Sequence, residues 1–403
     1  MATKPSKEPS QSSSPKKKSG KEYDLAALKK KVILNGAEIV AIGEEAELLV
    51  GGKNYNTAII SQVEGIKAPQ FRAVSSIAFH QLLDETKINA TLTRAVVDRE
   101  YKRIDWEDPE ISGDPEFLQK FVRNLGRAVR AEYESKGEGQ SQVKLRTFVN
   151  NVVEGFATSP EGIDQLRRRS ALVQAAILSV SLPESVAKEG REAYEEICKE
   201  AESEEVPVAV RSSAAGEDSR KKAFAGLQDT YLNVFGAEPV VTAYHWDCAS
   251  AYNLRSMTYR REAILDAITL AEETGDETIA EQAKKEWAIE NTSLSVCIMR
   301  MINPVISGTA FAADTATGCG GTGRNDLGSS DASYGLGEAV GGGMVTPDKY
   351  YVFSRDDGQE VVIGQMGCKD MKIVYEEGGG TRKVDVPPHE ASRWALSIAH
   401  AEN

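Results

Sequence analysis

The sequence predicts a mixed α/β protein built from two to three structural units. Its 403 residues correspond to that number at about 150 residues per unit. Short β-branched runs, such as residues 206–210 (VPVAV), alternate with long stretches of helical periodicity, such as residues 113–133. Hydrophobic residues make up 41% and charged residues 27% of the chain, which is typical of globular domains. No internal repeat is visible, so the sequence does not indicate a solenoid.

The first 22 residues form a basic leader that we expect to be disordered. Residues 1–21 (MATKPSKEPSQSSSPKKKSGK) hold six lysines and one glutamate, a net charge of +5, and almost no apolar side chain. A segment of this composition cannot bury enough apolar surface to fold by itself. It has no arginine and no amphipathic pattern, which disfavours a transit peptide.

The rest of the chain is acidic and shows no sign of a membrane segment. It carries a charge of −18, compared with −13 for the whole chain, and so repels the phosphate backbone of nucleic acids. No apolar run approaches the ~20 residues that span a bilayer, and no apolar signal-peptide core follows the start. We therefore expect a cytoplasmic protein that binds neither nucleic acid nor membrane.

The first half of the chain is predicted to be mainly helical. Residues 46–60 (AELLVGGKNYNTAII) run from an apolar stretch through a Gly-Gly turn into a helix. Residues 113–133 begin with Gly-Asp-Pro-Glu, a helix cap followed by proline at the first helical position. A second helix is predicted over residues 184–203. The strand at residues 206–210 is expected to deliver Arg211 into a loop.

The second half is predicted to change from helices to strands. Residues 239–290 have helical patterns, and residues 294–302 (LSVCIMRMI) are typical of a strand. Glycine is dense from residue 318 to residue 343, which predicts loops with close backbone approaches. Residues 349–353 and 361–375 alternate in the manner of sheet strands.

The cysteines and histidines indicate no metal or redox site. The cysteines are widely spaced, with no C-x-x-C pair, and the histidines show no ligand spacing. We expect reduced thiols packed as small apolar groups. The residues concerned are Cys198, Cys248, Cys297, Cys319 and Cys368, with His80, His245, His389 and His400.

Three segments combine glycine or serine with a cation or a polar side chain, and each has an ordinary structural alternative. In residues 51–54 (GGKN), backbone N–H groups and the lysine could face an anion, or the segment is a plain turn. In residues 208–218 (VAVRSSAAGED), the guanidinium of Arg211 suits a phosphate, or it pairs with Glu217 or Asp218. Residues 224–230 (FAGLQDT) could cover phosphates or form a surface loop.

Taken together, these blocks resemble the N-terminal nucleotide-binding region of the phosphoenolpyruvate synthase (pyruvate, water dikinase) family, which has an ATP-grasp fold. The resemblance implies a two-lobed nucleotide-binding domain of the pyruvate phosphate dikinase type. The first lobe would cover residues 23–235 with a helical insertion, and the second, truncated relative to the family, residues 236–403. The blocks occur in family order: VGGKN (50–54), VAVRSSAAGED (208–218), FAGLQDTYLNV (224–234), SGTAFAADTATG (307–318), ASYGLGEAVGGGMVTPDKYYVF (332–353) and GCK (367–369).

The resemblance also implies ATP and Mg²⁺ as ligands and assigns roles to single residues. Lys53 would contact the ATP phosphates and Arg211 would neutralise the triphosphate. The segment that begins at Met299 would bind adenine through its backbone, although the family commonly has glutamine at that position. Glu338 is a cleft residue or a structural carboxylate, and the metal ligands stay unassigned. The further binding residues implied are Gly51, Gly52, Ser212, Gly226, Gln228, Thr230, Arg300 and Met301.

The chain contains no T-S-H segment, the family's phosphohistidine motif. The resemblance therefore favours the ATP-binding subunit of a split dikinase, with the histidine on a partner subunit. Phenylphosphate synthase of anaerobic phenol degradation is such a split member, and phenol would be the acceptor. Two alternatives stay open beside it. One is a nucleotide-binding fragment of pyruvate, water dikinase, with pyruvate as acceptor, and the other is a non-catalytic nucleotide-sensing subunit. Related antibiotic phosphotransferases share the nucleotide domain and are less favoured.

Overall fold

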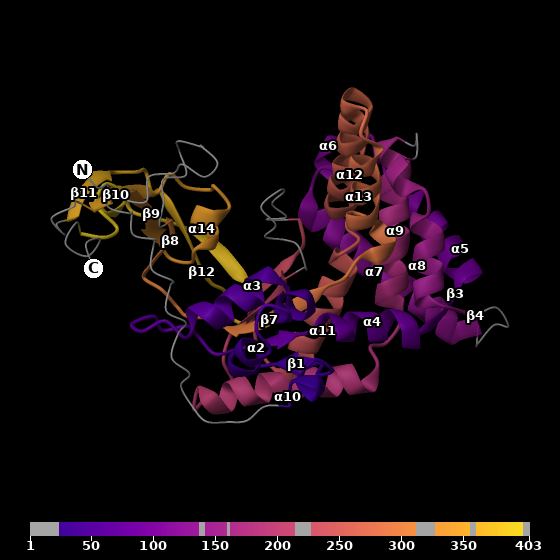
Figure 1. Cartoon of the computed structure of the whole chain (residues 1–403), viewed down its shortest axis with the longest axis horizontal. Helices are drawn as coiled ribbons and strands as arrows, with labels where there is room; N and C mark the ends of the chain where they lie inside the picture. Colours follow the sequence, from indigo (N-terminus) through magenta and orange to yellow (C-terminus); the bar gives the residue numbers. More distant parts are fainter. Residues whose placement is uncertain are drawn as a thin grey trace, which may run out of the picture.

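The computed structural model describes residues 24–136, 142–158, 162–213, 227–311, 327–354 and 360–397. The mixed α/β class is confirmed. Figure 1 shows a central sheet with helices on both faces, a helical part on one side and a second, smaller sheet on the other. The basic leader predicted for residues 1–22 lies outside the described residues.

The central sheet has five antiparallel strands in the order β1-β2-β7-β5-β6. β7 lies in the middle, and both of its faces are buried because its apolar side chains alternate between two cores. The strands are β1 (Ile33–Leu34), β2 (Phe71–Val74), β5 (Val208–Ser213), β6 (Thr230–Val234) and β7 (Ser295–Arg300).

Helices cover both faces of the central sheet. One face packs against α2 (Gly36–Ile42) and α3 (Ala46–Ile60), with the smaller core between them. The other face packs against α10 (Glu184–Glu200) and α11 (Ala237–Ser250), and its core continues into the helical part. We call the first of these two faces the α3 face. On it, every second residue of β5 and β7 points towards α3.

The lobe boundary predicted between residues 235 and 236 falls inside this central part. α11 and β7 both follow residue 235, yet they pack against the first sheet or belong to it. The apolar run of β7 finds its partners in β2 and β5, far away in sequence. In the structure the chain passes to the second sheet after residue 300.

The helical part is formed by the insertion that the sequence predicts and by the helices after residue 250. α9 is its centre, and its residues 170–177 are all buried. α12 and α13 pack on each other and rise together in Figure 1. The elements of this part are α4 (Ser76–Glu85), α5 (Ala90–Tyr101), α6 (Pro109–Ser112), α7 (Pro115–Lys136), α8 (Leu145–Val153), α9 (Ile163–Ser179), α12 (Leu254–Thr274), α13 (Glu277–Glu286), and a two-stranded antiparallel sheet of β3 (Lys87–Asn89) and β4 (Gln142–Lys144).

The second sheet is antiparallel, with strand order β11-β10-β9-β8, and a separate hairpin lies between it and the central part. A buried ion pair fixes its end: Lys369 Nζ lies 2.6 Å from Asp348 Oδ1, and both side chains are fully buried. The elements are β8 (Ile306–Phe311), β9 (Leu327–Tyr334), α14 (Glu338–Gly341), β10 (Asp348–Ser354), β11 (Glu360–Gln365), β12 (Met371–Tyr375), β13 (Thr381–Asp385) and α15 (Pro388–Ala391).

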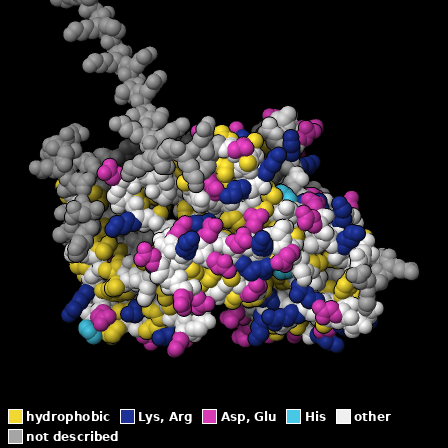
Figure 2. Space-filling model, turned by 90° about the horizontal axis from the view of Figure 1, so that it is seen from below, with side chains coloured by type: hydrophobic (Ala, Val, Ile, Leu, Met, Phe, Trp, Pro, Cys, Tyr) yellow, Lys and Arg dark blue, Asp and Glu magenta, His cyan; other side chains and the backbone are white. Residues whose placement is uncertain are grey.

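Surface charge is mixed rather than gathered by sign. On the face seen in Figure 2, acidic and basic side chains are interspersed. In the described part of the chain no single helix is long and apolar enough to cross a membrane. Among the described helices, only α9 and α10 taken together are long and apolar enough for a membrane span, and these two helices are bent by 82° relative to each other.

Candidate functional site

The two predicted phosphate-binding cations lie on elements that pack together at the α3 face of the central sheet, Lys53 on α3 and Arg211 on β5. Arg211 lies within β5, opposite Cys297 of β7 and Thr230 of β6. Burial raises the pKa of the Cys297 thiol to about 12, and the charges of Arg211 and Lys53 act in the opposite direction. Both cations therefore act on the same buried thiol, although they are far apart in the sequence.

The position of Arg211 differs from the one predicted. We expected the strand to end at residue 210 and to release Arg211 into a loop. β5 instead continues to Ser213 because each of its residues pairs with β7, and the last pair joins Ser213 to Ser295. The backbone of Arg211 is therefore held by a sheet strand rather than by a loop.

Lys53 follows a break in α3 at Gly51. Gly51 has φ 73° and ψ 163°, so a new helical segment begins after it. This puts the backbone N–H of Lys53 at a helix N-terminus, where N–H groups point outward and favour anions. Lys53 itself is part-buried. The predicted Gly-Gly turn is thus present as a kink inside one helix.

Ser213 fastens this helix start to the strand that carries Arg211. A Cβ on Gly51 would lie 1.9 Å from the Ser213 carbonyl oxygen, so only glycine allows this approach. The Asn54 N–H donates to Ser213 Oγ at 3.1 Å, and the Ser295 hydroxyl donates to the Ser213 carbonyl. These contacts fix the backbone beside Lys53 relative to β5.

Sequence reasoning did not single out Asn54 and Ser213 as residues that position the site. Asn54 is fully buried, and its Nδ2 donates to Val50 O at 2.8 Å. Its Oδ1 is buried with no hydrogen-bond partner among the described residues. The available signal was a polar side chain directly after Gly-Gly-Lys, but its partner lies 159 positions away.

The segment after residue 226 runs along the edge of the same sheet. Thr230 is exposed and lies opposite Arg211 in the register. Gln228 is part-buried, and its Oε1 has no hydrogen-bond partner among the described residues. Gly226 lies outside the described residues, as do Glu217 and Asp218, the alternative partners considered for Arg211. No ion pair joins Arg211 to a described residue.

Ser212 and Arg300 do not join the cations on the α3 face. Side chains alternate along a strand, so Ser212, opposite Val296, faces the other core. The Arg300 guanidinium donates to Gln70 Oε1 at 3.2 Å, and its backbone N–H donates to Gln70 O at 2.8 Å. The Arg300 side chain therefore has a structural partner, and the Ser212 side chain is buried on the other face of the sheet.

Met299 and Met301 take different positions at the end of β7. Met299 packs against the core under α3, on the same face as Cys297. The Met301 N–H donates to Pro207 O at 2.8 Å, and its Sδ accepts from the Asn233 N–H at 2.9 Å. The backbone N–H groups of residues 300 and 301, which we expected to bind adenine, are thus already used within the fold.

Glu338 lies in the second sheet region, not beside the cations in the central sheet. It is the first residue of α14 and is exposed, and its Oε2 accepts from Thr381 Oγ1 at 3.2 Å. Within the described ranges, no group of three or more His, Cys, Asp or Glu side chains is arranged to hold a metal ion. A lone exposed carboxylate could still complete the shell of a phosphate-bound Mg²⁺, which uses one or two carboxylates.

Comparisons with known proteins identify the family. A profile of the pyruvate phosphate dikinase, AMP/ATP-binding domain matches residues 47–403. A probable phosphoenolpyruvate synthase of Pyrococcus horikoshii is 27% identical over 354 residues, which is 86% of this chain and 35% of that protein. A phosphoenolpyruvate synthase of Aquifex aeolicus is 31% identical over 259 residues, 63% of this chain and 27% of that protein.

A phosphoenolpyruvate synthase of Deinococcus radiodurans is 33% identical over 230 residues, 56% of this chain and 25% of that protein. The chain thus spans about a third or less of the length of these relatives. The matched profile covers residues 47–403 and so includes Lys53, Arg211 and Glu338. The chain belongs to the family of the pyruvate phosphate dikinase AMP/ATP-binding domain.

Proposed function

We propose that this chain carries out the ATP-dependent half-reaction of a dikinase. Its two sheets act as the two lobes of an ATP-grasp site, and ATP lies between them. The observation that carries the proposal is the placement of Lys53 and Arg211 on the same face of the central sheet, where Ser213 of β5 contacts Gly51 and Asn54 of α3. Phosphoryl transfer depends mainly on positioning and charge neutralisation, and these two cations supply both.

In the proposed reaction, a histidine nitrogen attacks the β-phosphorus of ATP. The bond from that phosphorus to the oxygen shared with the α-phosphate breaks, and AMP leaves. Water then removes the terminal phosphate from the pyrophosphoryl-histidine, and the phosphohistidine donates its phosphoryl group to an acceptor. Lys53 and Arg211 stabilise the negative charge on the phosphate oxygens during the first step. The histidine comes from a partner subunit or domain, since no T-S-H segment is present in these 403 residues.

Pyruvate is the acceptor that the relatives favour. The curated relatives compared above are named phosphoenolpyruvate synthases, so we place the pyruvate, water dikinase reaction first. The phenol acceptor that we expected from the sequence has no counterpart among these relatives. Mg²⁺ would supply charge neutralisation on the phosphates when bound, with Glu338 as the candidate protein ligand.

The test of the site is the variant Arg211→Ala, assayed with ATP, Mg²⁺ and the histidine-bearing partner. AMP formation should fall at least about 10²-fold, the usual effect of losing one oxyanion-stabilising group. The urea unfolding curve should stay close to that of the unsubstituted protein. Arg168→Ala is a matched control, because Arg168 is half-exposed and pairs with Asp98 in the helical part. AMP formation at a near-normal rate in Arg211→Ala would refute the role of Arg211.

The partner and the acceptor need a separate experiment. Purification from the native source without an affinity tag, followed by mass spectrometry, should recover a polypeptide that contains a T-S-H segment. With that polypeptide present, pyruvate and phenol can be compared using AMP release as the readout. ATP binding without AMP release under those conditions would instead support the nucleotide-sensing alternative.

A further inference from the structure

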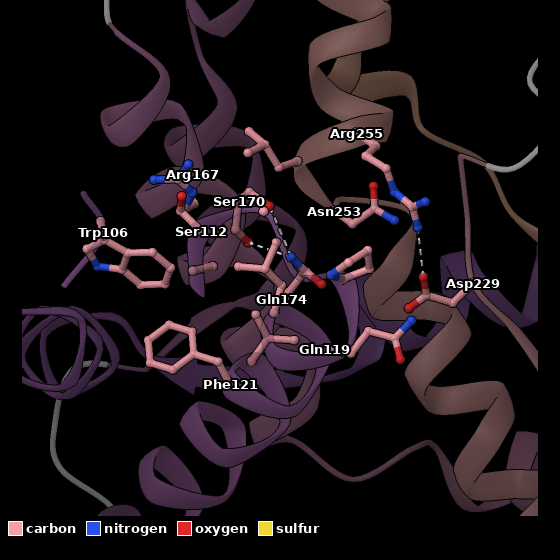
Figure 3. Close-up of a pocket in the computed structure, with 16 residues that line it drawn as sticks. Trp106, Ser112, Gln119, Phe121, Arg167, Ser170, Gln174, Asp229, Asn253 and Arg255 are labelled. Carbon is pink, nitrogen blue, oxygen red and sulfur yellow. Dashed lines mark hydrogen bonds and ion pairs between the residues drawn. The ribbon is translucent and has the colours of Figure 1, made fainter. Parts of the chain in front are cut away.

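A cavity in the helical part has the features of a second ligand site. Its volume is about 230 Å³, and it lies between α7, α9, the start of α12 and the segment before β6 (Figure 3). None of its lining residues belongs to the phosphate site described above. One end holds aromatic rings beside the Arg167 guanidinium, and the other holds Asp229 and Arg255 with amide groups, so the two ends of the cavity differ (Figure 3).

The aromatic end offers flat apolar surfaces. The Trp106 and Phe121 rings lie edge to face, with centroids 5.2 Å apart, and Leu118 adds an aliphatic surface from the same helix as Phe121. The indole N–H of Trp106 already donates to Tyr101 O at 2.9 Å. The Arg167 guanidinium also lies at this end, 5.2 Å from the centre of the Trp106 ring. This end therefore combines apolar ring surface with one cation, and edge-to-face packing is favourable for an added ring.

The polar end is built around a buried carboxylate that is weakly bonded. Asp229 is 9% exposed. Its Oδ1 accepts from Arg255 Nη2 at 3.4 Å and its Oδ2 from the Tyr231 hydroxyl at 3.3 Å, both long for charge-assisted hydrogen bonds. The Gln119 side chain also interacts with it, and burial raises the pKa of the Asp229 carboxyl. An ionised carboxylate has about four acceptor positions, so a further donor would stabilise it.

We propose that this cavity binds a single-ring aromatic molecule that carries a hydroxyl or amino group. The ring packs against Trp106 and Phe121, and the hydroxyl or amino group donates to Asp229. The cavity is large enough for such a ligand. An engineered cavity of about 150 Å³ holds benzene, and the larger volume here leaves room for the substituent. The proposal is independent of which acceptor the dikinase uses.

The cavity is connected directly to the strand beside Arg211. Asn253, which lines the cavity, donates from Nδ2 to Leu227 O at 2.8 Å. Asp229 immediately precedes Thr230, the residue opposite Arg211 in the sheet. A ligand that orders Asp229 therefore acts on the backbone next to the phosphate site, and its occupancy should change the dissociation constant of ATP.

The experiment compares phenol with toluene as probes of the full chain, by isothermal titration or ligand-observed NMR. The two molecules have the same ring and nearly the same size, but only phenol has a donor. Phenol should bind with a dissociation constant of about 1 mM, as expected for so small a ligand, and at least about tenfold more tightly than toluene. Equal affinity for the two, or no binding of phenol at about 10 mM, would overturn the proposal.

Two variants test the two ends of the cavity. Leu118→Trp should fill it and abolish binding of both probes, whereas Lys120→Trp adds the same ring at an exposed position of α7 and should change nothing. Asp229→Leu keeps the branching and the number of non-hydrogen atoms of the side chain but removes both oxygens, so the preference for phenol should disappear. Unchanged phenol binding in Leu118→Trp would refute the site. An ATP dissociation constant that does not respond to saturating phenol would refute the link to Thr230.

Discussion

Gly51→Ala tests whether the approach of α3 to β5 is what positions Lys53. Gly51 occupies φ 73° and ψ 163°, a region open essentially to glycine alone. The added Cβ would lie 1.9 Å from the Ser213 carbonyl oxygen and 2.5 Å from its Oγ. A carbon and a carbonyl oxygen normally stay about 3.3 Å apart, so the helix start must move away by more than about 1 Å.

The expected loss follows from two separate effects. Backbone strain in this region costs about 1–3 kcal/mol, and a steric overlap in a packed interior costs about 1–3 kcal/mol more. We therefore expect the free energy of unfolding to fall by about 2–6 kcal/mol. Lys53 lies two residues beyond the kink. A displacement of about 1 Å in a positioned group can lower the rate about 10²-fold, so ATP binding and AMP formation should both suffer.

Gly43→Ala is the matched control. Gly43 has a similarly unusual backbone, φ 80° and ψ −154°, but a Cβ there would meet no atom within 4 Å. It should lose only the strain, about 1–3 kcal/mol, and keep normal ATP affinity. Urea unfolding and titration with ATP measure the two effects separately. If Gly51→Ala lost no more stability than Gly43→Ala and bound ATP normally, the contact with Ser213 would not be what places Lys53.

Two further predictions concern buried charge and pH. Lys369→Met removes the cation that pairs with the buried Asp348 side chain, so urea unfolding should show a loss of about 3–5 kcal/mol. A loss below about 1 kcal/mol would contradict the importance of this pair. Burial lowers the pKa of His245 to about 4, and its ring nitrogen Nε2 lies 2.9 Å from Ile177 O. The unfolded chain then takes up a proton between about pH 6.5 and 4 while the folded protein does not, so stability falls by up to about 3 kcal/mol as the pH drops. The free energy of unfolding of His245→Gln should lack this part of the pH dependence. The same pH dependence in both proteins would refute this role of His245.

Features coded by neighbouring residues were predictable from the sequence. The helix α7 begins at Pro115, as the Gly-Asp-Pro-Glu pattern indicates, and Asp114 Oδ1 accepts from the Glu116 N–H at 2.9 Å. The predicted helix over residues 184–203 appears as α10. A side-chain cap marks the start of α7 only, since Pro183 before α10 makes no capping hydrogen bond. In both helices a periodic apolar face is a local signal, because the hydrogen bonds of a helix join residues four apart.

Features that depend on distant partners were not predictable in the same way. β5 extends to Ser213 because β7 pairs with it, and nothing local to Arg211 signals that extension. The contact between Gly51 and Ser213 joins segments about 160 positions apart. The cavity around Asp229 needs four separate segments to come together. Pattern reasoning therefore identified the two cations but not the contacts that hold them in place.

The two cations and Glu338 are held by different parts of the fold, and under the proposed function this would separate two steps of nucleotide binding. Lys53 and Arg211 are fixed to one sheet through Ser213 and the pairing of β5 with β7. Glu338 belongs to the second sheet region, which meets the first where Asn233 donates from Nδ2 to Glu376 O at 2.9 Å and to Gly380 O at 2.7 Å. A change in the angle between the sheets would therefore move Glu338 without changing the spacing of the two cations. If ATP binds as proposed above, the two cations would hold the phosphates first, and closure would then bring Glu338 towards a Mg²⁺ ion bound to those phosphates.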